Sequence, residues 1–492
     1  MTDLLASVAD LLDAQADATE QRQAAVTRHR TDPVAWVTER LNEETWSKQA
    51  AVMRALVDHR KVAVRSCHGS GKSHLASRLV AWWLDVHPPD DTFVVTTAPT
   101  FPQVRAILWR YIRQVHRRGQ LPGRVNQTEW LIDDELVAFG RKPADHDAAG
   151  FQGIHARHVL VVVDEACGIP ESLWYAIDSL TTNVGCAILA IGNPDDPTAY
   201  FRKINQEGSG WHVEHISAFD SPNLTGEPVS QRLAETLISA EWVAEKAAEW
   251  GVDNPVYTSK VLGEFPTQDP HAVVRIEDVT RCRILDIPRN PGELLPVELG
   301  IDVGGGGDLT VIRERRGPVA GREWTSRSDR PEELAPLAVR AILDTGATSV
   351  KVDSIGIGWG LIGELRNRAA RQEHAATVVA VNVAEKASDP TKYYNLRSEM
   401  WWNARERSAA RVWDLGSMDA ADQTVAELVE PRWTLDGAGR IKVESKDDIK
   451  ARAHGRSPDH ADALNLAFHQ PAHSLTGNFF DKLPGVAGQR SV

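Results

Sequence analysis

The stretch from Ser66 to Ser73 has the residue types and spacing of a loop that surrounds phosphate groups. It reads SCHGSGKS, follows the apolar run 61–66 and precedes a helix that we expect to begin near Lys72. Glycines let backbone N–H groups approach a polyphosphate, and a helix N-terminus favours negative charge. Lys72 would contact the β- and γ-phosphates of ATP, and Ser73 would bind Mg²⁺. The residues expected to hold ATP are Gly69, Ser70, Gly71, Lys72, Ser73 and, as a reader of adenine, Gln49.

An acidic pair follows a second apolar run, at residues 158–163. Asp164 and Glu165 would then lie at the carboxyl end of a buried strand, which is where α/β sheets bind ligands. We expect Asp164 to hold Mg²⁺ through water and Glu165 to orient and deprotonate the attacking water. The pair alone could be a helix cap, but together with Lys72 and Ser73 it indicates nucleotide hydrolysis.

Two weaker signals accompany these motifs. Asn193 ends another apolar run, where it could sense the γ-phosphate or simply lie in a turn between Gly192 and Pro194. The predicted helix 101–118 has one apolar face, and its arginines lie mostly elsewhere: Arg105, Arg110, Arg113, Arg117 and Arg118. These arginines fit a solvated face, contact with DNA phosphates, or an arginine finger offered to a neighbouring subunit, and the sequence leaves the three open.

Four aspartates in the C-terminal half could bind two metal ions. Asp302 and Asp353 each end an apolar run, and Asp459 and Asp462 share one face at the start of a helix. Carboxylate oxygens suit Mg²⁺ or Mn²⁺, and two such ions can activate water and stabilise the leaving oxygen in phosphodiester cleavage. Each aspartate alone could be a turn or a cap, but together they predict a nuclease. Either Asp459 or Asp462 could be the main third ligand, and His460 is assigned no catalytic role.

These residues must be positioned by the elements of an α/β chain. Alternating apolar runs and helices from residue 61 onward predict a mostly parallel sheet, and 298–327 predict consecutive antiparallel strands of a second, mixed sheet. We therefore expect five segments: an N-terminal helical segment at 1–45, a P-loop ATPase domain at 46–265, a linker at 266–293, a nuclease domain at 294–474 and a flexible tail at 475–492.

The composition is that of a globular protein. Of the 492 residues, 42% are hydrophobic and 25% charged, which excludes a wholly disordered or fibrous chain. The net charge of −13 argues against a simple basic coat for nucleic acid, although a local basic channel remains compatible with it. Four cysteines without a CxxC pair indicate a reducing compartment. The sequence shows no membrane-spanning run and no signal peptide, so we expect a cytoplasmic protein.

Taken in order, the motifs resemble those of the large terminase subunit of tailed bacteriophages. The resemblance covers roughly 45–470 and depends on SCHGSGKS, TTAPT, VVVDEA, IGNP, LGEFP, GIDVGGGGDLTVI, KVDSIGIG and KDDIKARAHGRSPDHADALNLAF. It implies an N-terminal P-loop ATPase of the RecA/ASCE type with a mostly parallel sheet, and a C-terminal RNase H-like nuclease with a mixed sheet. ATP hydrolysis would drive double-stranded DNA into a procapsid, and the nuclease would cut concatemers.

The resemblance also implies partners and a location. These are double-stranded DNA, the small terminase subunit, the portal protein and further copies of this chain in a ring, in the host cytoplasm and transiently at the portal, without a membrane and not in the mature virion. Ser66 stands where the usual P-loop has its first glycine. Because the loop departs from the common pattern there, the resemblance does not assign an arginine finger to a particular residue. Two alternatives remain: a helicase- or repair-type ATPase–nuclease, and a nucleotide-gated assembly protein with an inactive nuclease.

Overall fold

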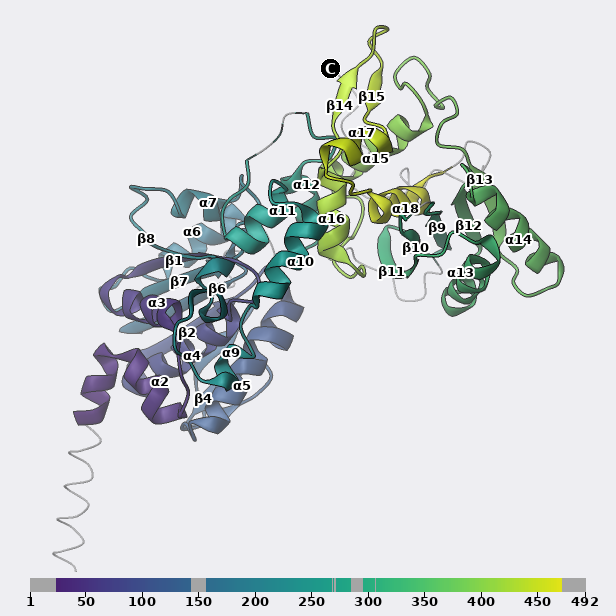
Figure 1. Cartoon of the computed structure of the whole chain (residues 1–492). Helices are drawn as coiled ribbons and strands as arrows, with labels where there is room; N and C mark the ends of the chain where they lie inside the picture. Colours follow the sequence, from purple (N-terminus) through teal and green to yellow (C-terminus); the bar gives the residue numbers. More distant parts are fainter. Residues whose placement is uncertain are drawn as a thin grey trace, which may run out of the picture. The chain divides into compact units, whose positions relative to one another are not determined.

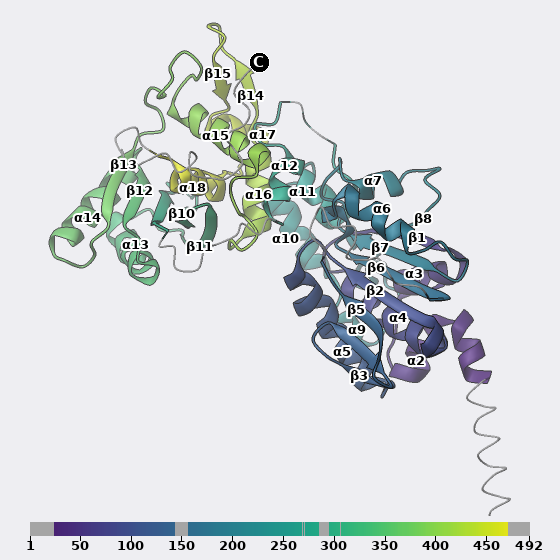
Figure 2. The ribbon, with the colours of Figure 1, turned by 180° about the vertical axis from the view of Figure 1, so that it is seen from behind.

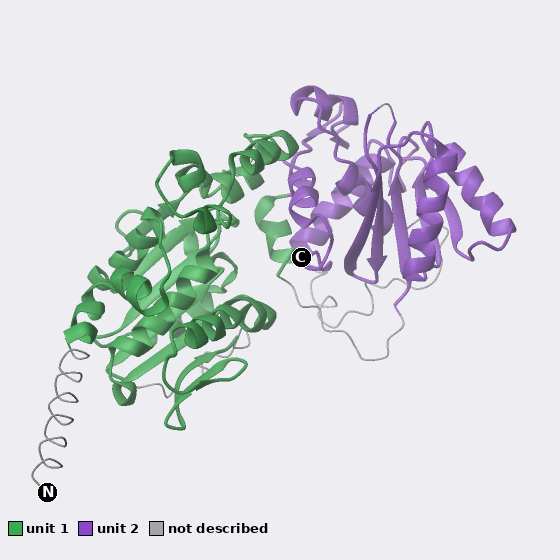
Figure 3. Ribbon diagram, turned by 60° about the horizontal axis from the view of Figure 1, so that its bottom comes forward, with its two compact units in different colours: residues 1–270, 275–287 green, residues 271–274, 288–492 purple. Residues whose placement is uncertain are grey.

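The computed structural model describes residues 24–142, 156–267, 269, 271–284, 295–305 and 307–470. The chain divides into two compact units, coloured separately in Figure 3. Unit 1 takes in 1–270 and 275–287, and unit 2 takes in 271–274 and 288–492. The predicted tail at 475–492 and the first part of the predicted N-terminal segment, 1–23, lie outside the described residues.

Unit 1 is built around a sheet with the strand order β3-β4-β5-β2-β6-β7-β1-β8. Its strands are β1 (Lys61–Ser66), β2 (Thr92–Thr97), β3 (Arg124–Val125), β4 (Glu129–Ile132), β5 (Glu135–Gly140), β6 (His158–Asp164), β7 (Ala187–Gly192) and β8 (His212–Ile216). All neighbours from β5 to β8 are parallel, and β3 and β4 add an antiparallel edge that the sequence did not predict. One strand, β7, separates β1 from β6, as in RecA/ASCE ATPases, so the predicted fold class is confirmed.

The helices of unit 1 are α2 (Pro33–Leu41), α3 (Ser47–Asp58), α4 (Lys72–Val86), α5 (Trp109–Arg118), α6 (Glu171–Ser179), α7 (Tyr200–Ile204), α8 (Pro222–Thr225), α9 (Gln231–Ala234), α10 (Ala240–Trp250), α11 (Pro255–Tyr257) and α12 (Ile276–Cys282). Shorter helical segments are η1 (Pro89–Asp91), η2 (Gln103–Leu108), η4 (Ala166–Gly168), η5 (Ala218–Asp220) and η6 (Thr258–Leu262). Helices α9 and α10 are separate, and Ser239 caps α10 by accepting the N–H of Trp242.

The apolar runs of the sequence become the core of unit 1. Alternate residues of β6 and β7 pack with Leu173, Trp174 and Ile177 of α6 and with Phe201 of α7 in one buried cluster. The predicted linker segment 266–293 contains a helix, α12, whose Arg281 pairs with Asp196 after β7. No helix in the described ranges is long and apolar enough to cross a membrane.

Unit 2 has a sheet with the order β11-β10-β9-β12-β13. The strands are β9 (Val297–Asp302), β10 (Thr310–Arg316), β11 (Val319–Ser326), β12 (Ser349–Asp353) and β13 (Thr377–Val381), and a hairpin is formed by β14 (Trp433–Leu435) and β15 (Ile441–Val443). Strands β9 to β11 are antiparallel, whereas β9, β12 and β13 are parallel. This is the mixed sheet of an RNase H-like fold, as the motifs implied.

Helices cover both faces of this sheet, as the two opposite views in Figures 1 and 2 show. They are α13 (Pro331–Thr345), α14 (Gly358–Ala370), α15 (Leu396–Ala410), α16 (Ala421–Val429), α17 (Lys446–Arg452) and α18 (Asp459–Phe468). Leu299 and Ile301 of β9 point into a core shared with α13 and α14. Because side chains alternate along a strand, Gly300 faces the other side, where α18 packs.

Candidate active sites

The loop between β1 and α4 has the conformation that its glycines allow. Gly69 and Gly71 have φ values of +73° and +82°, in the left-handed region that side chains disfavour. The Ser66 hydroxyl lies 2.6 Å from the Ser70 hydroxyl, so Ser66 bonds across the loop at the place where the usual motif has glycine. Lys72, only 8% exposed, donates to the carbonyl of Cys67 at 3.0 Å. The lysine is therefore held within the loop.

The predicted acidic pair lies beside this loop. The Ser73 hydroxyl donates to Asp164 Oδ2 at 2.8 Å, and the Glu165 N–H donates to Asp164 Oδ1 at 3.1 Å. Burial, reinforced by the neighbouring charge of Glu165, raises the pKa of Asp164 to about 7. Glu165 has a φ of +48°, a strained conformation of the kind that often occurs at functional sites. The structure thus brings Lys72, Ser73, Asp164 and Glu165 together.

Two further predicted residues reach the same loop. Asn193 accepts from Lys72 Nζ at 3.2 Å and donates to the Ser66 carbonyl at 2.6 Å. Gln49 is buried on α3, and its Nε2 lies 2.9 Å from the position that a Cβ on Gly71 would occupy. Both side chains therefore lie against the loop; adenine reading by Gln49 and γ-phosphate sensing by Asn193 stay predictions.

The contacts of the loop with β8 and η6 were not predicted from the sequence. Backbone N–H groups of Cys67 and His68 donate to the carbonyls of Ile216 and Lys260, at 2.8 and 2.7 Å. The Lys260 ammonium pairs with Asp195 Oδ2 at 2.8 Å, two residues after Asn193. The segment η6 therefore packs on the loop and is tied to the end of β7. Asp195 and its neighbour Asp196, after the IGNP motif, were the only hint in the sequence.

The arginines of the predicted helix 101–118 separate into two groups. Arg113 donates to the Gln127 carbonyl at 2.6 Å, and Arg118 donates to the Leu41 carbonyl at 2.6 Å, so both hold the fold together. Arg105, Arg110 and Arg117 are exposed and form no ion pair with a described residue, although the Arg110 guanidinium lies over the Tyr111 ring. The first group is structural, and the second keeps all three predicted roles open.

In unit 2, a close contact between β9 and α18 assembles the carboxylates. A Cβ on Gly300 would lie 2.2 Å from the Ala463 carbonyl oxygen and from the Ala467 nitrogen, so only glycine permits this approach. As a result, Asp459 and Asp462 on α18 lie near Asp302 at the end of β9. The Lys446 ammonium joins them, at 2.8 Å from Asp302 Oδ2, 3.3 Å from Asp462 Oδ2 and 3.4 Å from Asp459 Oδ1.

The two ambiguous aspartates have different partners. Asp462 accepts two bonds from Arg397 Nη1, at 2.9 and 3.1 Å, and one from Trp401 Nε1 at 3.0 Å. Asp459 accepts the backbone N–H of Leu309 at 3.0 Å, in the loop that follows the glycines. Asp462 shares a pocket with Asp302 and Asp353, whereas Asp459 supports the neighbouring loop. This difference favours Asp462 as the third ligand.

The electrostatics of this site call for a cation. Burial raises the pKa of Asp302 to about 8, with the like charges of Asp462 and Asp459 adding to the shift and Lys446 opposing it. Burial also raises the pKa of Asp353. Burial alone would raise the pKa of Asp462 as well, but the charges of Arg397 and Lys446 lower it below its usual value. Protein cations thus offset the carboxylates.

The donor atoms of this cluster are those that a divalent metal prefers. Oxygen donors of Asp302, Asp353 and Asp462 suit Mg²⁺ or Mn²⁺, and the Lys446 ammonium already lies where a cation is stabilised. Within the described ranges, however, no group of three or more His, Cys, Asp or Glu side chains is arranged so that it could hold a metal ion. The carboxylates suit the metal by the type of their donor atoms, but they would have to rearrange and Lys446 would have to withdraw before they could hold it.

A buried ionic network holds α18 in place behind the carboxylates. His460 Nδ1 lies 2.9 Å from Glu323 Oε2 on β11, and the Ala461 N–H donates to Glu427 Oε2 on α16 at 3.0 Å. Arg313, fully buried, pairs with the same Glu323 and donates to Thr424 Oγ1 at 3.0 Å. His460 therefore connects α18 to β11.

The sequence was compared with family models and with curated proteins. No family model matches the chain. A curated protein named "Probable terminase, large subunit", of Enterobacteria phage P7, is 25% identical over 451 residues, which cover 86% of this chain and 87% of that protein.

Solved structures with similarity include the large terminase of a thermophilic bacteriophage in complex with ADP (14% identity, 86% of this chain and 99% of that one, TM-score 0.40). The nuclease domain of the large terminase subunit of bacterial virus Sf6 is similar over 41% of this chain and 100% of its own, with 19% identity and a TM-score of 0.36. The curated relative confirms, over most of the chain, the resemblance to large terminase subunits that the ordered motifs predict.

Proposed function

We propose that this chain is the large terminase subunit of a tailed phage, with ATP hydrolysis in unit 1 driving double-stranded DNA into a procapsid and a nuclease in unit 2 cutting the DNA. The observation that carries the proposal is the pairing, in one chain, of a P-loop bonded to Asp164 and a carboxylate cluster around Lys446. The similarity to the phage P7 protein supports the same assignment.

In unit 1, the chain's own residues supply the parts for phosphoryl transfer to water. Backbone N–H groups of Gly69 to Ser73 surround the phosphates, and Lys72 exchanges its carbonyl and Asn193 partners for phosphate oxygens. Ser73 and Asp164 would hold Mg²⁺, which offsets the charge of the phosphates when bound. Glu165 would accept a proton from the attacking water.

In unit 2, the carboxylates would hold Mg²⁺ or Mn²⁺ once Lys446 has moved away. Asp302 lies at the end of β9, next to β12, which ends at Asp353, and Asp462 of α18 lines the same pocket, so these three side chains would hold the metal. Bound metal would supply water activation and charge stabilisation for phosphodiester cleavage. Asp459 would hold the loop that follows the glycines in place, by accepting the backbone N–H of Leu309.

The partners and the location follow from this function. The chain would act on double-stranded DNA together with the small terminase subunit and the portal protein, as a ring of copies, in the host cytoplasm and transiently at the procapsid. Arg105 and Arg117 are exposed in unit 1 and form no ion pair with a described residue, which leaves them available for DNA or for a neighbouring subunit.

The proposal is tested with two variants of the full chain, assayed for both ATP hydrolysis and cleavage of supercoiled plasmid in Mn²⁺. Lys72→Ala should lower ATP hydrolysis about 100-fold or more and leave cleavage intact, and Asp302→Asn should do the reverse. Lys203→Ala and Asp344→Asn, at exposed positions, are the matched controls. Loss of both activities in both variants would contradict two separate sites.

Two further results would favour the alternatives. Strand separation of a forked duplex by the wild type would indicate a helicase or repair enzyme. ATP-dependent assembly without any plasmid cleavage would indicate a nucleotide-gated assembly protein with an inactive nuclease.

A further inference from the structure

Two buried polar side chains beside the nuclease carboxylates lack partners for some of their atoms. Asn465 on α18 is 2% exposed, and neither its amide nitrogen nor its amide oxygen bonds to a described residue. Arg397 Nη2 is also buried without a partner among the described residues, although Nη1 binds Asp462. Leaving a buried polar group unsatisfied costs about 1–3 kcal/mol, so native proteins satisfy such atoms with water or a ligand.

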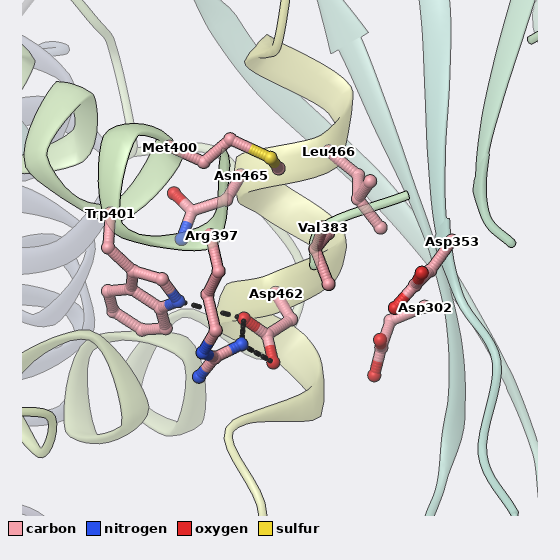
Figure 4. Close-up of a pocket in the computed structure, with 9 residues that line it drawn as sticks. All are labelled: Asp302, Asp353, Val383, Arg397, Met400, Trp401, Asp462, Asn465 and Leu466. Atoms are coloured by element: carbon pink, nitrogen blue, oxygen red, sulfur yellow. Dashed lines mark hydrogen bonds and ion pairs between the residues drawn. The ribbon is translucent and has the colours of Figure 1, made fainter. Parts of the chain in front are cut away.

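Both side chains line the pocket that Asp302, Asp353 and Asp462 share. Figure 4 shows Asn465, Arg397 and Asp462 on one side of this pocket and Asp302 and Asp353 on the other. The space open to a water-sized molecule is about 10 Å³, which is close to the least that one ordered water needs and far too small for an ordinary ligand. Much of the lining is apolar, so Asn465, Arg397 and the carboxylates are the polar partners that an ordered water there would have.

The geometry fixes where such water would bond. Asn465 follows Asp462 by three residues on α18, so both side chains lie on the same helix face. The Arg397 guanidinium is held at two other points, by Asp462 at Nη1 and by the Glu444 carbonyl at Nε (3.3 Å). Because the guanidinium is planar, these two contacts also fix the direction of Nη2, which is buried without a described partner.

We propose that Asn465 and Arg397 hold ordered water in this pocket and that this water keeps the Asp462 carboxylate oriented toward Asp302. The inference rests on the proposed nuclease function. Asn465 is then a positioning residue, which acts on Asp462 through Arg397 and touches neither metal nor DNA. Its amide can both donate to the water and accept from it, which neither Met400 nor Leu466 in the same pocket can do.

The expected effect lies in metal affinity. Groups that orient a metal-binding side chain typically change metal affinity or activity by about 10- to 100-fold when they are lost. Asn465→Leu keeps the approximate side-chain volume and removes both hydrogen-bonding atoms. It should therefore leave the fold intact and weaken Mn²⁺ binding about tenfold or more, while the plasmid-cutting rate recovers at saturating Mn²⁺.

The experiment measures Mn²⁺ affinity of the full chain by electron paramagnetic resonance, with the melting temperature in EDTA as the check on folding. Asn465→Ser keeps a hydroxyl for water and should bind Mn²⁺ within about threefold of wild type. Asn367→Leu, an exposed asparagine on α14, is the matched control and should behave as wild type.

Two outcomes would overturn the inference. One is an Asn465→Leu variant that binds Mn²⁺ as tightly as wild type; the other is a high-resolution crystal structure in which protein atoms, and not water, satisfy the Asn465 amide. If Asn465→Leu does not fold, equal affinities of Asn465→Ser and Asn465→Ala would overturn it instead. A wild type that neither binds Mn²⁺ nor cuts plasmid would remove the proposed nuclease itself, which is a different result from wild-type behaviour in the leucine variant.

Discussion

The two sites stabilise a buried aspartate differently. In unit 1, Asp164 accepts a neutral hydroxyl and a backbone N–H, and Lys72 is turned toward a carbonyl and an amide. In unit 2, Asp302 and Asp462 bind the cationic side chains of Lys446 and Arg397 directly. The first site therefore holds its lysine on neutral oxygen acceptors, which an anionic nucleotide would have to displace, whereas the second pairs its carboxylates with protein cations, which a bound metal would have to displace.

The difference also shows in how each site is assembled. Lys72, Ser73 and the loop glycines are neighbours in sequence, and Asp164 ends a strand of the same parallel sheet. The carboxylates of unit 2 come from β9, β12 and α18, and their cations come from α15 and α17. The second site therefore depends on helix packing to a degree that the first does not, and a disturbance of packing should affect cleavage before it affects ATP hydrolysis.

The strongest effect should follow from Glu165→Gln, which removes the proposed base and keeps the side-chain shape. ATP hydrolysis should fall about 1,000-fold with ATP affinity little changed, because general-base catalysis contributes roughly 10²- to 10⁴-fold. Plasmid cleavage by unit 2 should be unaffected. Hydrolysis at the wild-type rate would show that Glu165 is not the base; Glu171→Gln, on the exposed start of α6, is the control.

The two aspartates of α18 should differ when each is changed to asparagine. Asp462→Asn breaks the pairing with Arg397 and leaves a buried cation without its partner, so cleavage should fall about 100-fold or more. Asp459→Asn can still accept the Leu309 N–H through its amide oxygen and should lose about tenfold. Plasmid nicking rates of the two variants decide the third ligand, and the opposite order would assign that role to Asp459.

Gly300→Ala tests the dependence of the nuclease on packing. The added Cβ would meet the backbone of α18, so α18 must shift, at a cost of about 1–3 kcal/mol in the free energy of unfolding and with loss of cleavage. Gly363→Ala is the matched control, because nothing lies within 4 Å of a Cβ at that helical position. Denaturant unfolding and plasmid nicking measure both effects, and normal cleavage by Gly300→Ala would contradict the packing argument.

The sequence predicted the parts of the molecule that are encoded locally. The strand–loop–helix around Lys72 and the strand ends at Asp164, Asp302 and Asp353 follow from short apolar runs and adjacent polar residues. The cations of unit 2 could not be found in this way, because Lys446 and Arg397 reach their aspartates only through the packing of α15 and α17. Lys446 opens the KDDIKAR stretch of the last motif, which was the one available signal.

Three elements escaped prediction for a different reason. Strands β3 and β4 span only two and four residues, which is too short for a period to identify them. Helix α12 lies in a segment rich in proline and charge, and the Arg281–Asp196 ion pair that joins it to the rest of unit 1 spans distant parts of the sequence. In each case tertiary contacts, and not local propensity, determine the structure.

Lys446→Met tests whether this lysine occupies the place of a metal ion in unit 2, by comparing thermal stability in EDTA and in Mn²⁺. In EDTA the variant leaves three carboxylates without their shared cation, so its melting temperature should fall by several degrees. Adding Mn²⁺ should raise the melting temperature more in the variant than in wild type, because metal and lysine compete for the same carboxylates. Thermal unfolding with and without Mn²⁺ measures both, and an equal metal response in the two proteins would show that Lys446 does not occupy the metal position. Lys442→Met, on β15, is the control.

The smallest effect concerns the exposed arginines of unit 1. If Arg105 and Arg117 contact DNA phosphates, each change to alanine should lower the slope of log binding constant against log salt by about 0.9 and weaken DNA binding by a few-fold, with ATP hydrolysis unchanged. Arg113→Ala is the matched control on the same helix: it loses the bond to the Gln127 carbonyl, so it should lower stability and leave the salt slope unchanged. Fluorescence anisotropy of labelled duplex across a salt series distinguishes the two groups. An unchanged slope together with a collapse of ATP hydrolysis in Arg105→Ala or Arg117→Ala would assign the affected residue to the arginine finger, because an exposed arginine that acts at a neighbour's nucleotide supports hydrolysis without contributing to DNA affinity.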